Sequence, residues 1–328
     1  MLARAPDQAP PRLATYGLSK AFRITRGRSR HTLVRAVDDV SLRLAEGQTL
    51  GIVGESGCGK STLGRLLAGL IAPTSGSIEV EGRCYDGVIW ATKHLRGRVQ
   101  MVFQDPSSAL DPQMTIGASV AEPVLLGPRP AAKVATHEML RLVGLPDDAY
   151  RRRPHELSGG EQQRACLARA LVGGHRVIVL DEVVSALDPI LRAQILALIQ
   201  TLQSELKTSY LFISHDLRAV ITVSSKVAVM YLGAVVELAP VANFRRGDLL
   251  HPYSVALHSA MLPLTRSKAT TGIVLRGEMP NAADRPSGCP FHPRCPVAQS
   301  NCRTEKPTLV SIKPGVEVAC HYPGALTA

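Results

Sequence analysis

The sequence predicts an α/β fold in which a parallel β-sheet is covered by helices. Short apolar runs typical of buried strands alternate with longer segments of helical periodicity. Several of the apolar runs end directly at loops that carry glycine, carboxylate or histidine side chains, as strands do when their carboxyl ends share a site. We expect a core domain at 13–246, a frayed N-terminus at 1–12 and a C-terminal extension at 247–328.

The first half of the core shows strand patterns separated by glycine-containing turns and one helix. Glu46-Gly47 and Ser75-Gly76 are the predicted turns. The predicted elements are strands at 36–44 and 48–53, a helix at 60–68 and strands at 77–82 and 98–104.

The stretch that follows the fourth strand lacks this alternation, so we predict a helical subdomain inserted at about 105–165. The second half of the core then returns to the alternating pattern. Its predicted elements are a helix at 161–173, a strand at 177–182, a helix at 189–206 and a strand at 209–215.

Composition limits the class of protein. The chain has 328 residues and a formal net charge of +11, and only 4% of its residues are aromatic. Without aromatic residues among the basic clusters we expect no nucleic-acid partner. No apolar run reaches the length of a membrane span and the start has no secretory pattern, so we expect a cytosolic protein with reduced thiols.

The most informative motif is GESGCGKST at 54–62, which fits the phosphate-binding P-loop between a strand and a helix. Backbone N–H groups of such a loop point at phosphate oxygens, the lysine adds a cation and the hydroxyl after it is a Mg²⁺ ligand. The predicted nucleotide-binding residues are Gly54, Ser56, Gly57, Cys58, Gly59, Lys60, Ser61 and Thr62.

A buried strand, VIVLDE, delivers two carboxylates at its end. Asp181 is suited to the Mg²⁺ shell together with Ser61. Glu182 points to the other side of the strand and is predicted to polarise a water in line with the γ-phosphate. These residues together indicate hydrolysis of a nucleoside triphosphate.

The string LSGGEQQR at 157–164 is very similar to the signature loop of ABC ATPases, which lies between the P-loop and the carboxylate strand. The resemblance implies that this loop completes the nucleotide site of a partner ATPase in a head-to-tail dimer, because a helix N-terminus is a ready anion site. The residues concerned are Leu157, Ser158, Gly159, Gly160 and Glu161.

The same resemblance assigns the other motifs. Gln104 corresponds to the Q-loop glutamine near Mg²⁺ and water, His215 to the switch histidine, and Phe22 to the aromatic on which adenine stacks. Glu182, His215 and Gln104 are therefore the expected catalytic residues, and Ser61, Gln104 and Asp181 the expected Mg²⁺ ligands. The D-loop that crosses the dimer seam is identified as Ser185, Ala186, Leu187 and Asp188.

A long insertion between Phe22 and Ala36, the string FQDPSSALDP, and HPY at 251–253 before a Cys/Pro-rich tail resemble the ATPases of dipeptide, oligopeptide and nickel importers. The resemblance implies ATP and Mg²⁺ as cofactors, a peripheral place on the cytoplasmic face of the inner membrane, and three kinds of partner. These are a second, different ATPase, two permeases and an extracytoplasmic solute-binding protein. The alternatives are an ATPase for nickel or another small solute, or an ABC protein outside transport.

Four of the seven cysteines and ten of the 23 prolines lie in the extension. Cys289, Cys295, Cys302 and Cys320 lack the close C-x₂₋₄-C pairs of zinc sites. Their spacing resembles the tail of peptide-importer ATPases, some of which bind a [4Fe–4S] cluster. An iron–sulfur cluster, zinc and free thiols all remain open at this point.

Overall fold

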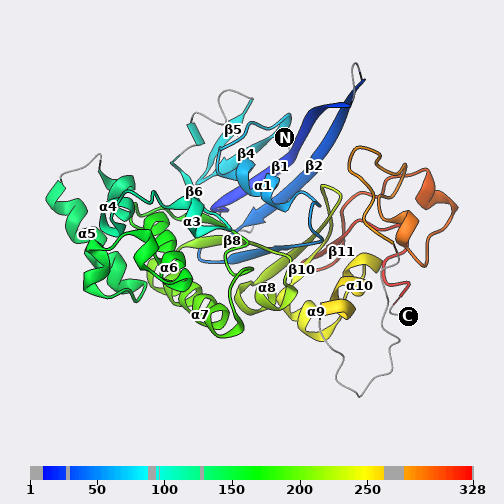
Figure 1. Cartoon of the computed structure of the whole chain (residues 1–328). Coiled ribbons are helices and arrows are strands. Elements are labelled where there is room, and N and C mark those ends of the chain that lie inside the picture. Colours follow the sequence, from blue (N-terminus) through cyan, green and yellow to red (C-terminus); the bar gives the residue numbers. More distant parts are fainter. Residues whose placement is uncertain are drawn as a thin grey trace.

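The computed structural model describes residues 10–26, 30–87, 94–95, 97–125, 129–261 and 277–326. Two sheets are stacked, and the segment from α4 to α6, drawn in cyan to green, gathers at one side of the molecule (Figure 1). The C-terminal segment, drawn from orange to red, lies against the end of the larger sheet that carries β10 (Figure 1).

The larger sheet has the strand order β11-β12-β10-β9-β3-β8-β7-β6. Its middle strands β9, β3, β8, β7 and β6 are parallel, and β10, β12 and β11 extend it antiparallel. The bounds are β3 Thr49–Val53, β6 Val99–Val102, β7 Val177–Asp181, β8 Ser209–Ser214, β9 Lys226–Tyr231, β10 Ala234–Pro240, β11 Val310–Lys313 and β12 Val316–Val318. The predicted α/β class with a parallel sheet is confirmed.

The smaller sheet is antiparallel in the order β2-β1-β4-β5. Its strands are β1 Leu13–Arg26, β2 Arg30–Leu44, β4 Ser75–Val80 and β5 Arg83–Asp86. The predicted break at Ser75-Gly76 is wrong, because β4 already begins at Ser75 and Gly76 adopts a φ of 85° within it. A Cβ at Gly76 would lie 2.4 Å from the Gly17 carbonyl oxygen, so this glycine permits close strand contact instead of ending the strand.

Helices occupy the segments that connect the strands, with α9 and α10 following the antiparallel strand β10. They are α1 Lys60–Leu67, α3 Pro106–Ala109, α4 Ile116–Ala121, α5 Arg129–Leu142, α6 Gly159–Leu171, α7 Pro189–Leu206, α8 Leu217–Val223, α9 Val241–Arg246 and α10 Pro252–Met261. Short 3₁₀ turns lie at Glu122–Val124, Asp147–Arg151, Pro154–Glu156, His292–Arg294 and Ser300–Arg303. The helix predicted at 161–173 is α6, which begins two residues earlier and ends two residues earlier.

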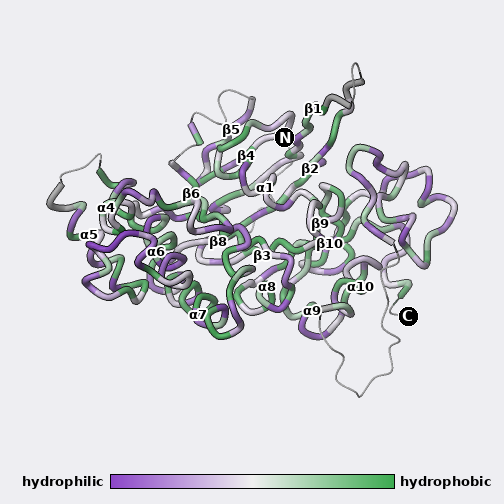
Figure 2. Tube along the Cα trace, viewed as in Figure 1, coloured by the Kyte–Doolittle hydropathy of each residue, from purple (hydrophilic) through white to green (hydrophobic). Residues whose placement is uncertain are grey.

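Alternate side chains of each central strand point to opposite faces of the larger sheet, so the hydrophobic core has one part on each face. In β8, Leu211 and Ile213 face the smaller sheet and α1, whereas Tyr210 and Phe212 face the helices on the opposite side. The trace is correspondingly hydrophobic along the central strands β3 and β8 (Figure 2). The sheet is therefore buried on both faces, which holds its loops in fixed positions.

The C-terminal segment is part of this core. β12 pairs with β10 through Glu237 and Leu238, and Phe291, Cys289 and Cys302 are buried within the same hydrophobic cluster as the core helices. Sequence reasoning treated this region as a separate extension because its prolines and short strands give no periodic signal.

The N-terminal end of the described chain is paired with β2. Of the terminus predicted to be frayed, 1–9 lie outside the described residues, and Arg12 donates its backbone N–H to the Leu44 carbonyl. In the described ranges, no helix is both long enough and apolar enough to cross a bilayer.

Candidate nucleotide site

The P-loop connects β3 to α1, and glycines make its path possible. Gly59 has a φ of 109°, and a Cβ there would lie only 2.0 Å from the Ala36 carbonyl oxygen. Any side chain would therefore force β2 and the loop apart. The loop is thus packed against β2 as tightly as its backbone allows.

Lys60 begins α1 and is buried, with only 6% of its surface exposed. Its ammonium group donates to the carbonyl oxygens of Gly54, at 2.8 Å, and Glu55, at 3.0 Å. The cation is thus positioned inside the curve of the loop, where phosphate oxygens bind in P-loop proteins.

The next residue, Ser61, donates its hydroxyl to Asp181 Oδ1 at 3.0 Å. Burial at the end of β7 raises the pKa of Asp181, and the nearby charge of Glu182 adds to this, while the Ser61 hydrogen bond opposes it. A hydroxyl and a carboxylate oxygen in contact are the hard donors that Mg²⁺ prefers, and a cation there would favour the charged carboxylate. These residues fit a Mg²⁺ site that shares further oxygens with a bound phosphate.

Glu182 follows in the left-handed conformation, with a φ of 53°. A non-glycine residue pays of order 1–3 kcal/mol for such a conformation, so the surrounding structure must hold it in place. Its N–H donates to the Ile213 carbonyl, and its Oε2 lies 2.9 Å from His215 Nδ1. The turn carries the Glu182 carboxylate away from Asp181 and places it beside the histidine at the end of β8.

The predicted residues come together around a cavity of about 400 Å³. Segments from five parts of the chain form its wall. The lining residues are Ala36, Ser56, Gly57, Gly59, Lys60, Ser61, Thr62, Gln104, Glu182 and His215.

Three of the predicted nucleotide-binding residues lie outside the lining of this cavity, as does Asp181 of the predicted Mg²⁺ ligands. Cys58 is 1% exposed and its thiol points into the core, so only its backbone is available to a nucleotide. Gly54 packs its backbone on β9, with the place of a Cβ 2.3 Å from the Met230 carbonyl oxygen. Phe22 is 41% exposed on β1, with Lys20 Nζ 5.2 Å from its ring centroid.

The signature loop does not line the cavity, and hydrogen bonds within the loop hold it in place. Ser158 caps α6, and both its N–H and its hydroxyl donate to Glu161 Oε2 at 2.8 Å. The backbone hydrogen bond and then the hydroxyl of Ser158 lower the pKa of Glu161. Gly159 is exposed and has no atom within 4 Å of the place of a Cβ. Of these residues, none lines the P-loop cavity of its own chain.

The D-loop connects β7 to α7. Ser185 donates its hydroxyl to the Glu182 carbonyl, and Asp188 caps α7 through the N–H groups of Ile190 and Leu191. Sequence reasoning missed Arg192, which pairs with Asp216 at 2.7 Å and also donates to the Leu187 carbonyl. This side chain ties the D-loop to the segment that carries His215. A single arginine on a helix gives no sequence signal of that role.

Comparison with known proteins decides the family. The family described as ABC transporter matches residues 37–185, and the family described as oligopeptide/dipeptide transporter, C-terminal region, matches residues 236–302. The di/tripeptide transport ATP-binding protein DppF of Pseudomonas aeruginosa is 42% identical over 94% of this chain and 97% of its own length. The chain belongs to the ABC transporter ATP-binding proteins.

Further similarities agree with this assignment. The oligopeptide transport ATP-binding protein AppF of Bacillus subtilis is 43% identical over 88% of this chain and 89% of its own length. Among solved structures, a dimeric post-hydrolysis state of an ATP-binding cassette with ADP and phosphate aligns with a TM-score of 0.61 at 25% identity, covering 70% of this chain and 98% of that one. The predicted ABC ATPase, with ATP as its nucleotide, is confirmed.

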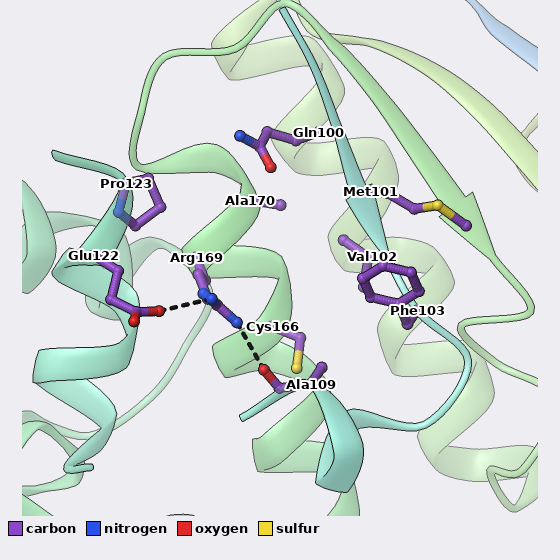
Figure 3. A pocket seen from close by; sticks show the side chains of 10 residues that line it. All are labelled: Gln100, Met101, Val102, Phe103, Ala109, Glu122, Pro123, Cys166, Arg169 and Ala170. Atoms are coloured by element: carbon purple, nitrogen blue, oxygen red, sulfur yellow. Dashed lines mark hydrogen bonds and ion pairs between the residues drawn. The ribbon is translucent and has the colours of Figure 1, made fainter. Parts of the chain in front are cut away.

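This ABC ATPase also has a groove of about 430 Å³ beside the nucleotide site (Figure 3). β6 forms one wall with Phe103, and Glu122, Cys166 and Arg169 line the helical side. Arg169 pairs with Glu122 at 2.6 Å and donates to the Ala109 carbonyl at 2.7 Å, which fixes the helical wall. Phe103 is 38% exposed and directly precedes Gln104 of the nucleotide site.

The four cysteines of the C-terminal segment line one small enclosed space, together with His251, Phe291 and Tyr322. All four are free thiols. Burial raises the pKa of Cys289 and Cys295, and raises that of Cys320 to about 11. Four thiols around one space fit an iron–sulfur cluster in the kind of ligand. In the part of the chain that the structure describes, however, no three metal-binding side chains are spaced for a single metal ion.

Proposed function

We propose that this ABC ATPase is the motor subunit of a bacterial importer of dipeptides and oligopeptides. The observation that carries the proposal is that Glu55 of the P-loop bonds to Tyr253 and Arg294, which both lie in the region 236–302 that matches the oligopeptide/dipeptide transporter family. DppF and AppF, the relatives described above, are named for di/tripeptide and oligopeptide transport. The alternative is an importer of nickel or another small solute.

Hydrolysis follows from the geometry of the cavity. Lys60 and the N–H groups of its loop bind the phosphates. Ser61, Asp181 and Gln104 would hold Mg²⁺, which supplies charge neutralisation for the transferred phosphoryl group. Glu182 accepts the proton of the attacking water, and His215, 2.9 Å from its carboxylate, orients that carboxylate.

A second ATPase subunit completes the proposed unit. The exposed helix N-terminus at Ser158 and Gly159 is an anion site without a phosphate ligand in its own chain. We propose that it binds the nucleotide of a different partner ATPase across a head-to-tail interface. If Glu182→Gln protein alone formed a stable dimer with ATP, a homodimer would replace this heterodimer.

The groove beside Gln104 is the proposed contact for the permeases. A permease helix bound against Phe103 would contact the residue directly before Gln104, which lines the nucleotide cavity. Movement of that permease helix would therefore shift Gln104 relative to the γ-phosphate. The chain would then lie peripherally on the cytoplasmic face of the inner membrane, with a solute-binding protein acting on the permeases from outside.

Phe103→Glu tests this contact, with Leu206→Glu as the matched control, because both side chains are 38% exposed. We expect Phe103→Glu to abolish peptide uptake while the isolated subunit still hydrolyses ATP, and Leu206→Glu to leave both unchanged. Equal uptake by the two variants would exclude the groove as the permease contact.

We also propose that Cys289, Cys295, Cys302 and Cys320 bind an iron–sulfur cluster, supported by their arrangement around one space. The test is anaerobic purification with iron and sulfide analysis of the wild type and a Cys295→Ser variant. Iron-free, colourless wild-type protein under these conditions would exclude the cluster.

The substrate is tested by uptake in cells that lack the chromosomal copy of this subunit. Complementation with the wild type should restore uptake of a labelled dipeptide, and Lys60→Ala should not. Measurement of ⁶³Ni²⁺ uptake in the same strains separates the alternatives, since restored nickel uptake without peptide uptake would overturn the peptide assignment.

A further inference from the structure

Glu55, the second residue of the P-loop, is held by the C-terminal part of the chain. Its carboxylate accepts a 2.8 Å hydrogen bond from Arg294, and its backbone N–H donates to the Tyr253 hydroxyl at 2.9 Å. Its carbonyl accepts from Lys60 Nζ at 3.0 Å. Two of the three groups that hold this loop residue therefore come from regions about 200 residues or more away, 198 for Tyr253 and 239 for Arg294.

Both of these side chains are rigidly supported. Arg294 is only 6% exposed, and its guanidinium carbon lies 5.9 Å from the centre of the Tyr231 ring. Tyr253, Tyr231 and Phe291 are buried and pack with ring centroids 4.7 to 5.4 Å apart. Phe291 also accepts the Arg294 N–H through its carbonyl. The arginine therefore has little freedom to follow a moving loop.

A second attachment of the C-terminal segment is at β2. Asp38 on β2 accepts ion pairs from Lys306 and Arg285, both at 2.7 Å. Although its burial acts to raise the pKa of Asp38, the Lys306 hydrogen bond and the neighbouring cations lower it. Asp38 is two residues from Ala36, whose carbonyl packs against Gly59. The C-terminal segment thus contacts both the P-loop and the strand on which that loop rests.

From this arrangement we propose that Arg294 and Tyr253 are positioning residues for the P-loop, through which the C-terminal segment sets the affinity of the ATPase for nucleotide. Arg294 and Tyr253 fix Glu55, and the Glu55 carbonyl in turn accepts a hydrogen bond from Lys60. The P-loop is thereby kept in the conformation that binds phosphate. Pre-organisation of a loop strengthens binding because less ordering remains to be done when the ligand arrives. The effect belongs to nucleotide binding and not to the water-polarising step at Glu182.

The test uses four variants of the full chain. Arg294→Gln removes the charge, Arg294→Lys keeps it, Tyr253→Phe removes one hydroxyl, and Arg303→Gln is the control on an exposed arginine of the same segment. MgADP affinity is measured by calorimetry, and KM and kcat are measured with MgATP. We expect Arg294→Gln to weaken affinity about tenfold, in line with loss of one charge-assisted hydrogen bond. Tyr253→Phe should weaken it about threefold, and Arg294→Lys should recover part of the loss.

The KM-against-kcat comparison separates positioning from a merely structural role. We expect KM to follow the affinity while kcat at saturation changes less than about twofold. In a Glu55→Gln background, Arg294→Gln should have little further effect, because its partner is already neutral. Lower melting temperatures with unchanged affinity would overturn the proposal. If Arg294→Gln fails to fold, unchanged affinity in both Arg294→Lys and Tyr253→Phe would overturn it equally.

Discussion

Mild acid should destabilise this protein through His251, the first residue of the HPY motif. His251 is 1% exposed, and its Nδ1 accepts the backbone N–H of Tyr253 at 3.0 Å. A nitrogen that accepts carries no proton, so the folded state holds the neutral ring. Burial lowers the pKa of His251 from its ordinary value of 6.5 to about 3.

The sign and size of the effect follow from that shift. Below pH 6.5 the unfolded chain binds a proton at this histidine that the folded chain does not bind, so stability falls as pH decreases toward 3. One pH unit below 6.5 corresponds to about 1.4 kcal/mol, so this residue should destabilise the fold by about 1.4 kcal/mol between pH 7.5 and 5.5. Glu237 lies beside it and acts in the opposite direction, because burial raises its pKa.

Urea unfolding followed by circular dichroism at pH 7.5, 6.5 and 5.5 measures the difference. His251→Asn isolates the effect, because the Asn carbonyl can accept the same N–H and does not titrate. We expect the free energy of unfolding of the wild type to fall by about 1.4 kcal/mol more than that of His251→Asn over this range. His155→Asn, at an exposed histidine, should parallel the wild type. Parallel pH curves for wild type and His251→Asn would refute the reasoning.

Three further perturbations address the nucleotide site. Glu182→Gln should keep ATP affinity within about threefold and lower turnover by at least about a hundredfold, because only the water-polarising group is lost; near-normal turnover would remove Glu182 from that role. Gly59→Ala should abolish nucleotide binding, since its Cβ would lie 2.0 Å from the Ala36 carbonyl oxygen, and calorimetry showing normal affinity would contradict this. Ser158→Arg should abolish transport while the isolated subunit still binds ATP; loss of ATP binding in the folded monomer would argue against action across a dimer.

The local features of the core could be predicted from the sequence. The helix at 189–206 and the strands ending in Asp181 and Ser214 have the predicted positions within one residue, because apolar periodicity and capping residues act over a few neighbours. The P-loop, the paired acids and His215 were also recognisable, since each motif follows the end of a strand. Parallel strands present those ends at one edge of the sheet, so the residues meet there.

The long first hairpin was missed in part. Its strand Leu13–Arg26 contains several polar and basic residues, so it has little of the alternation that predicts a strand. The position of Phe22 on its exposed part could not be inferred either, because exposure depends on where the hairpin leaves the smaller sheet.

Sequence alone determined the chemistry of this chain: a phosphate-binding loop, two acids, a histidine and a signature loop, each coded by a few adjacent residues. Only the tertiary structure decided how the C-terminal segment relates to that chemistry. β12 has three residues and pairs with a strand about 80 positions earlier, and Arg294 reaches Glu55 across 239 positions. Such contacts depend on the folded arrangement of the whole sheet, and no short pattern encodes a single long-range ion pair.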